Sequence, residues 1–283
     1  MVLSRCPIGV IDSGVGGVSV LNALSRLLPE ENYIYLSDSA HAPYGIRTDA
    51  EIREVALCNA EYLIFMGCKA LVIACNTATA VAVSDIRLRF PHIPVVGIEP
   101  SVRPALAYAR ENGGDVLVLA TEVTVNGERF RRLCSRCCEE IGGVYARDGD
   151  VRDEKLRLPH LYSLALRDTV GFVERGEISS VEHISYLKKR LSPYAERLFS
   201  AVVLGCTHFP FAAEGISEAL GYSVSFFDGA NGTAKRLACL LEENKLMHSA
   251  QGVGRGWIEW IDTGGVADVS RKLRLFRRKR LPY

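Results

Sequence analysis

The sequence predicts an α/β protein with two similar domains, each built as a doubly wound parallel sheet. Three observations support this prediction. Four short runs of aliphatic and β-branched residues each end in a small polar or thiol residue, helix-like segments lie between them, and the pattern of the first part returns in the second. Continuous apolar runs are typical of strands that helices cover on both faces. We expect a pseudo-two-fold relation between the domains, with the functional site between them.

Each predicted strand ends where a ligand is expected to bind. In open α/β sheets, ligands collect at the carboxyl ends of the strands, beside the N-termini of the following helices. The last residue of each run is therefore a first candidate for chemistry. The runs are Ile8–Asp12 (IGVID), Leu71–Cys75 (LVIAC), Val116–Thr121 (VLVLAT) and Val202–Cys206 (VVLGC).

Helices are predicted between these strands. Ser19–Leu28 gathers its apolar side chains on one face and stops before a proline. Thr48 lies three residues before Glu51, the pattern of a capping box, and starts a second helix that Gly67 can end. A third helix is predicted over Thr77–Phe90, which two prolines follow.

Two segments rich in proline or glycine indicate the domain boundaries. His92–Pro104 is the predicted crossing into the second domain, and Ser225–Thr233 the return to the first. We therefore expect a first domain of residues 1–98 plus 228–283 and a second of residues 99–227. A chain of 283 residues is long enough for two domains with their own cores.

The composition argues for a small ligand. Lysine and arginine (34) nearly balance aspartate and glutamate (33), so no overall charge indicates a binder of nucleic acid or of a membrane surface. The apolar run Ile8–Ile11 is too short for a signal peptide, and no apolar stretch has the length of a membrane span. We expect a cytoplasmic protein.

The nine cysteines fit free thiols in a reducing compartment better than a disulfide framework. Cys134, Cys137 and Cys138 include one CxxC pair, but a zinc site needs a second pair of ligands and none follows at suitable spacing. We interpret these three as packing residues and expect no metal site.

Two other cysteines stand out because each ends a strand and is followed at once by polar side chains. Asn76 and Thr77 follow Cys75, and the sequence continues from Cys206 with Thr207 and His208. A following helix N-terminus would favour the thiolate, which is a usable base or nucleophile. A histidine two residues beyond the second thiol can exchange a proton near neutral pH, whereas alone it would be read as structural.

The glycine-rich segment after the first strand suits a small anion. The dinucleotide pattern G-x-G-x-x-G fails, because Ser19 stands where the third glycine belongs after Gly14 and Gly16. Backbone N–H groups at a helix start still suit a carboxylate. Asp12 directly precedes them, and could pass a proton or orient the thiol of Cys75.

The segment Ser37–Thr48 contains a Pro-Tyr-Gly turn with two interpretations. It could close a loop over the site, or it could be an ordinary tight turn in which Tyr44 is a packing residue.

Seven motifs together resemble one family over essentially the whole chain. They are IDSGVGG, APYGIR, ACNTATA, VVGIEP, GCTHFP, DGANGTA and the late DTGG. This combination is similar to the glutamate racemases of the aspartate/glutamate racemase superfamily, which use no cofactor. The resemblance implies that glutamate is inverted by two thiols, one on each face of the α-carbon. It also implies a homodimer and a supply of D-glutamate for peptidoglycan.

The resemblance assigns roles residue by residue. Cys75 would serve the D-glutamate face with help from Asp12, and Cys206 the L-glutamate face with help from His208. A further catalytic carboxylate maps to Glu174. The residues implied to bind substrate are Asp12, Ser13, Tyr44, Gly45, Asn76, Thr77, Thr121, Thr124, Thr207 and His208.

The chain departs from the family pattern at four positions. Leu166 and Arg167 replace a Cys-Pro dipeptide, which bears on the alignment of Glu174. Val123 replaces a glycine, and Gly127 replaces a serine or threonine, so pocket shape or substrate affinity can differ.

Three rival functions follow from the same sequence. The thiol pair would equally serve a racemase of aspartate or hydantoin, while the presence of both thiols disfavours a one-thiol decarboxylase. The basic run Arg271–Arg280 would suit contact with nucleic acid or an acidic protein, although such runs are more often solvated helix ends.

Overall fold

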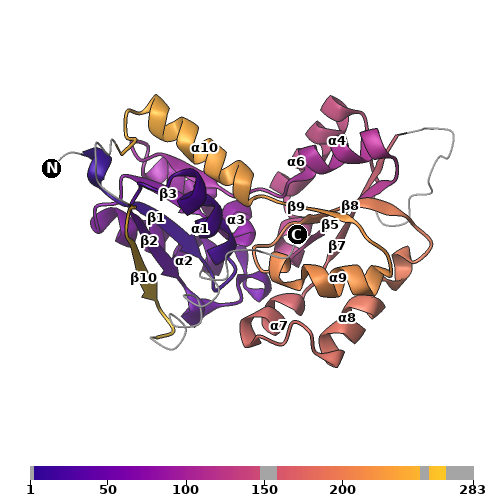
Figure 1. The fold of residues 1–283 in the computed structure, drawn as a ribbon. Coiled ribbons are helices and arrows are strands. Elements are labelled where there is room, and N and C mark those ends of the chain that lie inside the picture. The colour runs from indigo at the N-terminus through magenta and orange to yellow at the C-terminus, as the bar shows by residue number, and fades with distance from the viewer. Residues whose placement is uncertain (1–2, 147–157, 249–254, 266–283) are drawn as a thin grey trace. The chain divides into compact units, whose positions relative to one another are not determined.

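The computed structural model describes residues 3–146, 158–248 and 255–265 (Figure 1). They form two compact units. The first runs to Glu99 and resumes at Gly229, and the second is Pro100–Asp228. The basic run Arg271–Arg280 lies outside the described residues.

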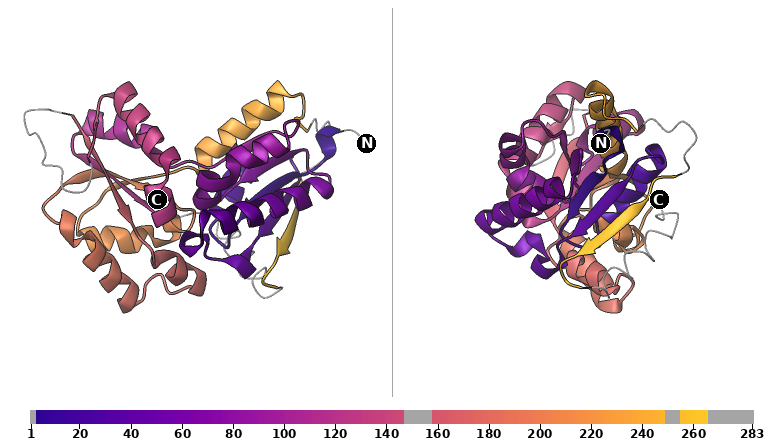
Figure 2. Two further views of the ribbon diagram at one scale, coloured as in Figure 1. Left: turned by 180° about the vertical axis from the view of Figure 1, so that it is seen from behind. Right: turned by 90° about the vertical axis from the view of Figure 1, so that its left-hand side faces the viewer.

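The first unit is a parallel five-stranded sheet with strand order β10-β2-β1-β3-β4. Helix α1 packs with α10 and α2 packs with α3 (Figures 1 and 2). Right-handed crossovers place these two pairs on opposite faces of the sheet. The strands are β1 (Ile8–Asp12), β2 (Tyr33–Ser37), β3 (Ala70–Ile73), β4 (Val95–Gly97) and β10 (Ile258–Asp262), and the helices are α1 (Val18–Leu27), α2 (Asp49–Phe65), α3 (Asn76–Arg89) and α10 (Ala230–Glu243).

The second unit is also a parallel five-stranded sheet, with strand order β6-β7-β5-β8-β9. Helix α4 packs with α6, and α8 with α9. The strands are β5 (Asp115–Ala120), β6 (Val144–Tyr145), β7 (His160–Ala165), β8 (Phe199–Leu204) and β9 (Ser225–Asp228), and the helices are α4 (Val102–Asn112), α5 (Glu122–Asn126), α6 (Glu128–Ile141), α7 (Thr169–Arg175), α8 (Val181–Leu191) and α9 (Ala213–Leu220).

The two sheets share their central topology. β1 lies between β2 and β3, and β5 lies between β7 and β8 in the same way. After these strands, the N–H of Ala74 donates to Ile11 at 2.7 Å, and the N–H of Gly205 donates to Leu119 at 2.7 Å. The residues that follow these two donors, Cys75 and Cys206, therefore occupy equivalent positions. The prediction of two doubly wound α/β domains is confirmed, while the symmetry relation and a site between the domains stay predictions.

The predicted elements match the observed ones with small shifts at their ends. β1 has the predicted bounds, while β3, β5 and β8 end one or two residues earlier, because the chain leaves the ladder before the polar loop residues. The capping box is present: the N–H of Thr48 donates to Glu51 at 2.8 Å, and the Glu51 N–H donates to the Thr48 hydroxyl at 3.3 Å. Gly67 follows α2 with φ +84°, a conformation that favours glycine.

The three cysteines of α6 are packing residues, as predicted. Cys134, Cys137 and Cys138 lie in the core of the second unit with Phe130. Burial, with a smaller effect of Cys137, raises the pKa of Cys138 to about 11, which keeps it an unreactive thiol at neutral pH. Within the described ranges, no helix has the length and apolar character needed to cross a membrane.

Candidate active site

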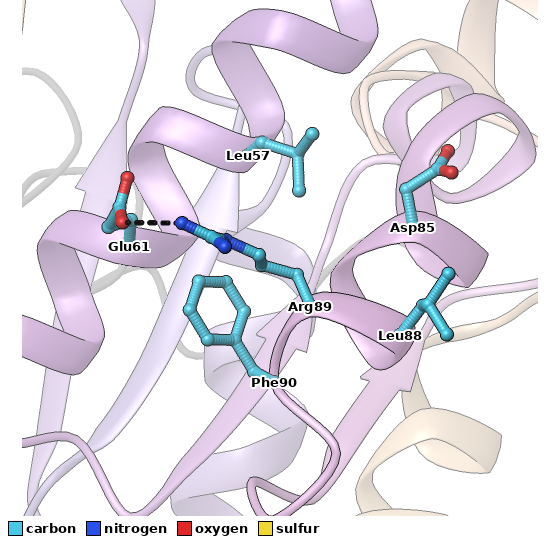
Figure 3. Close-up of a pocket in the computed structure, with 6 residues that line it drawn as sticks. All are labelled: Leu57, Glu61, Asp85, Leu88, Arg89 and Phe90. Carbon is cyan, nitrogen blue, oxygen red and sulfur yellow. Dashed lines mark ion pairs between the residues drawn. The ribbon is translucent and has the colours of Figure 1, made fainter.

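A pocket of about 570 Å³ opens between α2 and α3, away from the strand ends. Figure 3 shows Arg89 reaching across it toward Glu61, with 3.6 Å between the charged atoms. A helix rise of about 1.5 Å per residue puts Leu88 roughly 18 Å from Asn76, the first residue of α3. The pocket is therefore not the predicted site. It is lined by Leu57, Glu61, Asp85, Leu88, Arg89 and Phe90.

Asp12 is held under the glycine-rich loop that follows β1. One oxygen of its buried carboxylate accepts the N–H groups of Gly14 and Gly17, each at 2.9 Å. A Cβ at Gly17 would lie 2.5 Å from the Cβ of Asp12 and 2.8 Å from the hydroxyl oxygen of Tyr35. The close approach of loop and carboxylate therefore requires glycine at this position.

Cys75 caps the N-terminus of α3, as predicted. Its buried sulfur accepts the N–H of Ala78 at 3.5 Å and contacts the hydroxyl of Ser13 at 3.7 Å. The partial positive charge of the helix start favours a thiolate here. Asn76 and Thr77 are buried in the first turn, and Oδ1 of Asn76 has no hydrogen-bond partner among the residues that the structure describes.

Tyr44 is buried at the start of the short 3-10 helix Tyr44–Ile46, which also carries Gly45. Its hydroxyl donates to Asp38 at 2.6 Å. Burial, then the hydrogen bond and charge of Asp38, raise its pKa, and the charges of Cys75 and Asp12 raise it further. Tyr44 is thus a packed residue, as one interpretation of this turn expected, while closure of the turn over the site stays a prediction.

The second thiol has a different set of partners. Sγ of Cys206 lies 3.7 Å from Nδ1 of His208, and Nε2 of His208 lies 2.6 Å from a carboxylate oxygen of Glu174. Burial by itself lowers the pKa of His208, but the hydrogen bonds and charges of Cys206 and Glu174 outweigh it, so the pKa is raised well above its usual value. The raised pKa favours the protonated imidazole next to the sulfur.

The expectation that a helix N-terminus follows Cys206 directly is wrong. The 3-10 helix Phe209–Ala212 comes first, and α9 begins only at Ala213. Pro210 has no N–H to give to the carbonyl of Cys206, which instead accepts the N–H of Phe209 at 3.0 Å. Positive charge at this thiol comes from a side chain in place of an α-helix.

Two threonines follow the central strand of the second unit, one as the N-cap of α5 and one within it. Thr121 caps α5, and its hydroxyl lies 3.0 Å from that of Thr124, both buried. Thr207 is also buried, beside the thiol in the sequence. Val123 lies within α5, and Gly127 joins α5 to α6.

The segment that carries Glu174 is well placed despite its departure from the family pattern. Leu166 is buried, and its N–H donates to the carbonyl of Ala120 at 2.9 Å. Arg167 is exposed. Helix α7, which follows, brings Glu174 to His208, so the substitutions do not remove this carboxylate from the site.

Sequence reasoning missed Asp38. This carboxylate is fully buried, and follows β2 at the same sheet edge as Asp12. The signal was available, because Asp38 ends an apolar run, Tyr33–Ser37, that the prediction left out.

The comparisons with known proteins agree with this arrangement. A family model described as Asp/Glu/Hydantoin racemase matches residues 8–237. This chain belongs to the Asp/Glu/hydantoin racemase family. The glutamate racemase of Clostridium perfringens is 39% identical over 272 residues, which cover 96% of this chain and 97% of the relative.

Two crystal structures of family members are similar over nearly their whole length. A Francisella tularensis glutamate racemase in complex with D-glutamate has a TM-score of 0.77 at 28% identity, covering 99% of this chain and 96% of its own. An Escherichia coli glutamate racemase in complex with L-glutamate and the activator UDP-MurNAc-ala has a TM-score of 0.75 at 27% identity, covering 97% and 95%. The predicted family is confirmed.

Proposed function

We propose that this racemase interconverts L-glutamate and D-glutamate through Cys75 and Cys206, and that it supplies D-glutamate for peptidoglycan in the cytosol. The observation that carries the proposal is the equivalence of the two thiols: each follows a strand adjacent to the central strand of its sheet. Relatives named glutamate racemase, two of them holding D- or L-glutamate, support glutamate as the substrate.

The reaction needs two acid/base groups, because the α-proton leaves one face and a proton returns to the other. From D-glutamate, the Cys75 thiolate takes the α-proton and becomes a thiol. The Cys206 thiol then gives its proton to the opposite face of the carbanion and becomes a thiolate. L-glutamate runs through the same steps in reverse, so no atom is gained or lost.

The carbanion must be stabilised by fixed donors, because an α-proton beside a carboxylate is very weakly acidic. On the Cys75 side, the positive end of the α3 dipole is the proposed source of this stabilisation. The N–H groups of Gly14 and Gly17 in the glycine-rich loop are taken by Asp12 and instead hold that carboxylate. On the Cys206 side, His208 contacts the sulfur, and Glu174 holds the imidazole in place. Ser13, Tyr44, Gly45, Asn76, Thr77, Thr121, Thr124 and Thr207 are the proposed substrate contacts.

Circular dichroism and proton NMR in deuterated water test the proposal. Wild-type protein should racemise D-glutamate and exchange its α-hydrogen, while Cys75→Ala and Cys206→Ala should each lose at least about 10³-fold in kcat/KM. Cys58→Ala and Cys239→Ala, at exposed thiols, are the matched controls and should remain active. Racemisation retained in either test variant would contradict the two-thiol mechanism.

Two further measurements decide the substrate and the assembly. Faster turnover of aspartate or hydantoin than of glutamate would change the assigned substrate but keep the chain in the same family. We also propose a homodimer on the family resemblance, and sedimentation equilibrium at twice the chain mass of 31.1 kDa would support it.

A further inference from the structure

A buried carboxylate outside the proposed thiol machinery joins several side chains of the first unit by hydrogen bonds. Both oxygens of Asp38 are engaged: one accepts the hydroxyl of Tyr44 at 2.6 Å, and the other accepts the hydroxyl of Thr263 at 2.9 Å and contacts Nδ1 of His41 at 2.8 Å. A fully buried carboxylate needs such partners, because an unpaired one would be strongly destabilising. Asp38 is therefore a fixed point of this part of the fold.

The contact with Asp38 decides which hydrogen bond the hydroxyl of Tyr44 donates and which it accepts. A phenol has one proton, and this proton is given to Asp38. The phenol oxygen is then left as an acceptor, and Nδ2 of Asn59 lies 3.4 Å from it. The side chain of Tyr44, which is 1% exposed, therefore anchors the turn that contains Gly45.

The support for Asp38 comes from the far end of the described chain. Thr263 follows β10, and its hydroxyl also accepts the N–H of Ala40 at 3.0 Å. The N–H of Gly264 donates to the hydroxyl of Ser39 at 3.2 Å. The late DTGG motif thus holds the segment between β2 and Tyr44 in place through these hydrogen bonds.

We propose that Asp38 is a positioning residue for substrate: it fixes the Tyr44–Gly45 turn by taking the phenol proton, and Thr263 holds it in place to do so. The inference rests on the proposed glutamate racemase activity. Asp38 acts through Tyr44 because its two oxygens are already occupied by side chains of the protein.

A double-mutant cycle with Asp38→Asn and Tyr44→Phe tests this. An asparagine has only one amide oxygen for the two sides where Asp38 accepts a hydroxyl proton, so either Tyr44 or Thr263 would face an NH2 donor and lose its hydrogen bond to residue 38. Both outcomes loosen the turn. We expect Asp38→Asn to raise KM for glutamate on the order of 10-fold to 100-fold, with a smaller fall in kcat. In the Tyr44→Phe background the same change should cost less than about twofold, because the partner hydroxyl is gone.

The readout separates positioning from a general loss of structure. If Asp38 only supported folding, the active fraction would fall, so kcat would drop while KM stayed the same. Tyr33→Phe is the matched control, since Tyr33 also donates a buried hydroxyl, to Leu28 at 2.9 Å, but at the opposite end of β2. Its KM should equal that of the wild type.

Thr263 gives a second and milder test. Thr263→Val removes the hydroxyl and should raise KM for glutamate. Thr263→Ser keeps a hydroxyl and should leave KM at the wild-type value. Equal KM values for wild type, Asp38→Asn and Thr263→Val would overturn the inference, as would a full Asp38→Asn effect in the Tyr44→Phe background. Wild-type protein inactive on glutamate would instead overturn the proposed function, so the two failures are distinguishable.

Discussion

The two thiols occupy equivalent places in two sheets of like topology, yet different chemical groups support them. Cys75 sits at the first turn of an α-helix, among a serine hydroxyl, backbone N–H groups and the loop that encloses Asp12. Cys206 precedes a 3-10 turn and is contacted by His208, which Glu174 holds. Thus one thiol is supported mainly by fixed dipoles, and the other by a titratable charge.

The difference has a local physical cause at the start of the following segment. Asn76 and Thr77 let α3 begin directly after Cys75, so the N–H of Ala78 donates to the sulfur. Pro210 prevents the same hydrogen bonding after Cys206. A protonated imidazole replaces the missing helix start. We therefore expect the surroundings of the two thiols to respond differently to mutation and to pH.

The largest effect is expected when the charged group at Cys206 is removed. His208→Asn keeps a polar side chain but loses the proton, so kcat/KM should fall on the order of 10² to 10⁴-fold. His92→Asn, at an exposed histidine, is the control and should be unchanged. Circular dichroism on both glutamate enantiomers measures the effect. Activity of the test variant within tenfold of wild type would mean that Cys206 does not depend on an imidazolium.

A smaller effect is expected from the loop on the Cys75 side. Gly17→Ala would place a Cβ 2.5 Å from Asp12, so the loop or the carboxylate must move. We expect a loss of about 1–3 kcal/mol in the free energy of unfolding and roughly a tenfold loss in kcat/KM.

Gly232→Ala, within α10, is the matched control for this substitution. No atom lies within 4 Å of the added Cβ, so its stability should stay the same or rise by up to about 1 kcal/mol. Urea unfolding of both variants measures the difference. A Gly17→Ala protein as stable as the Gly232→Ala protein would show that the loop accommodates a side chain.

The effect expected from Glu174→Gln is confined to part of the pH range. Glu174 helps to raise the pKa of His208, so the neutral amide should lower that pKa toward its usual value of about 6.5. His208 then loses its proton at lower pH, and the alkaline limb of kcat/KM should move to lower pH, with about a tenfold loss above neutrality.

The free energy of unfolding should depend on pH through the same histidine. The stabilisation from protonated His208 is complete below about pH 6.5, its unfolded value, and is lost as pH rises through the raised folded pKa. The Glu174→Gln variant should lose this stabilisation at a lower pH than the wild type. Urea unfolding between pH 6 and pH 9 measures this shift, and identical profiles would show that Glu174 does not act on His208.

The sequence by itself determined the features that are local along the chain. An apolar run that ends in a thiol, as at Cys75 and Cys206, predicts a buried strand with a reactive group at its edge. The capping box at Thr48 and the packing role of Cys134 also follow from residues a few positions apart. Pro210 is a signal of the same local kind for the 3-10 helix after Cys206, but the prediction did not use it.

Only the tertiary structure decided which distant residues meet. Glu174 reaches His208 across 34 positions, and Thr263 reaches Asp38 across 225. No periodicity along the chain carries such pairings, because they depend on which strands become neighbours and on where each connecting helix then delivers its side chains. Local sequence patterns predict the positions of the two thiols at strand ends, and the packing of each sheet determines which groups surround them.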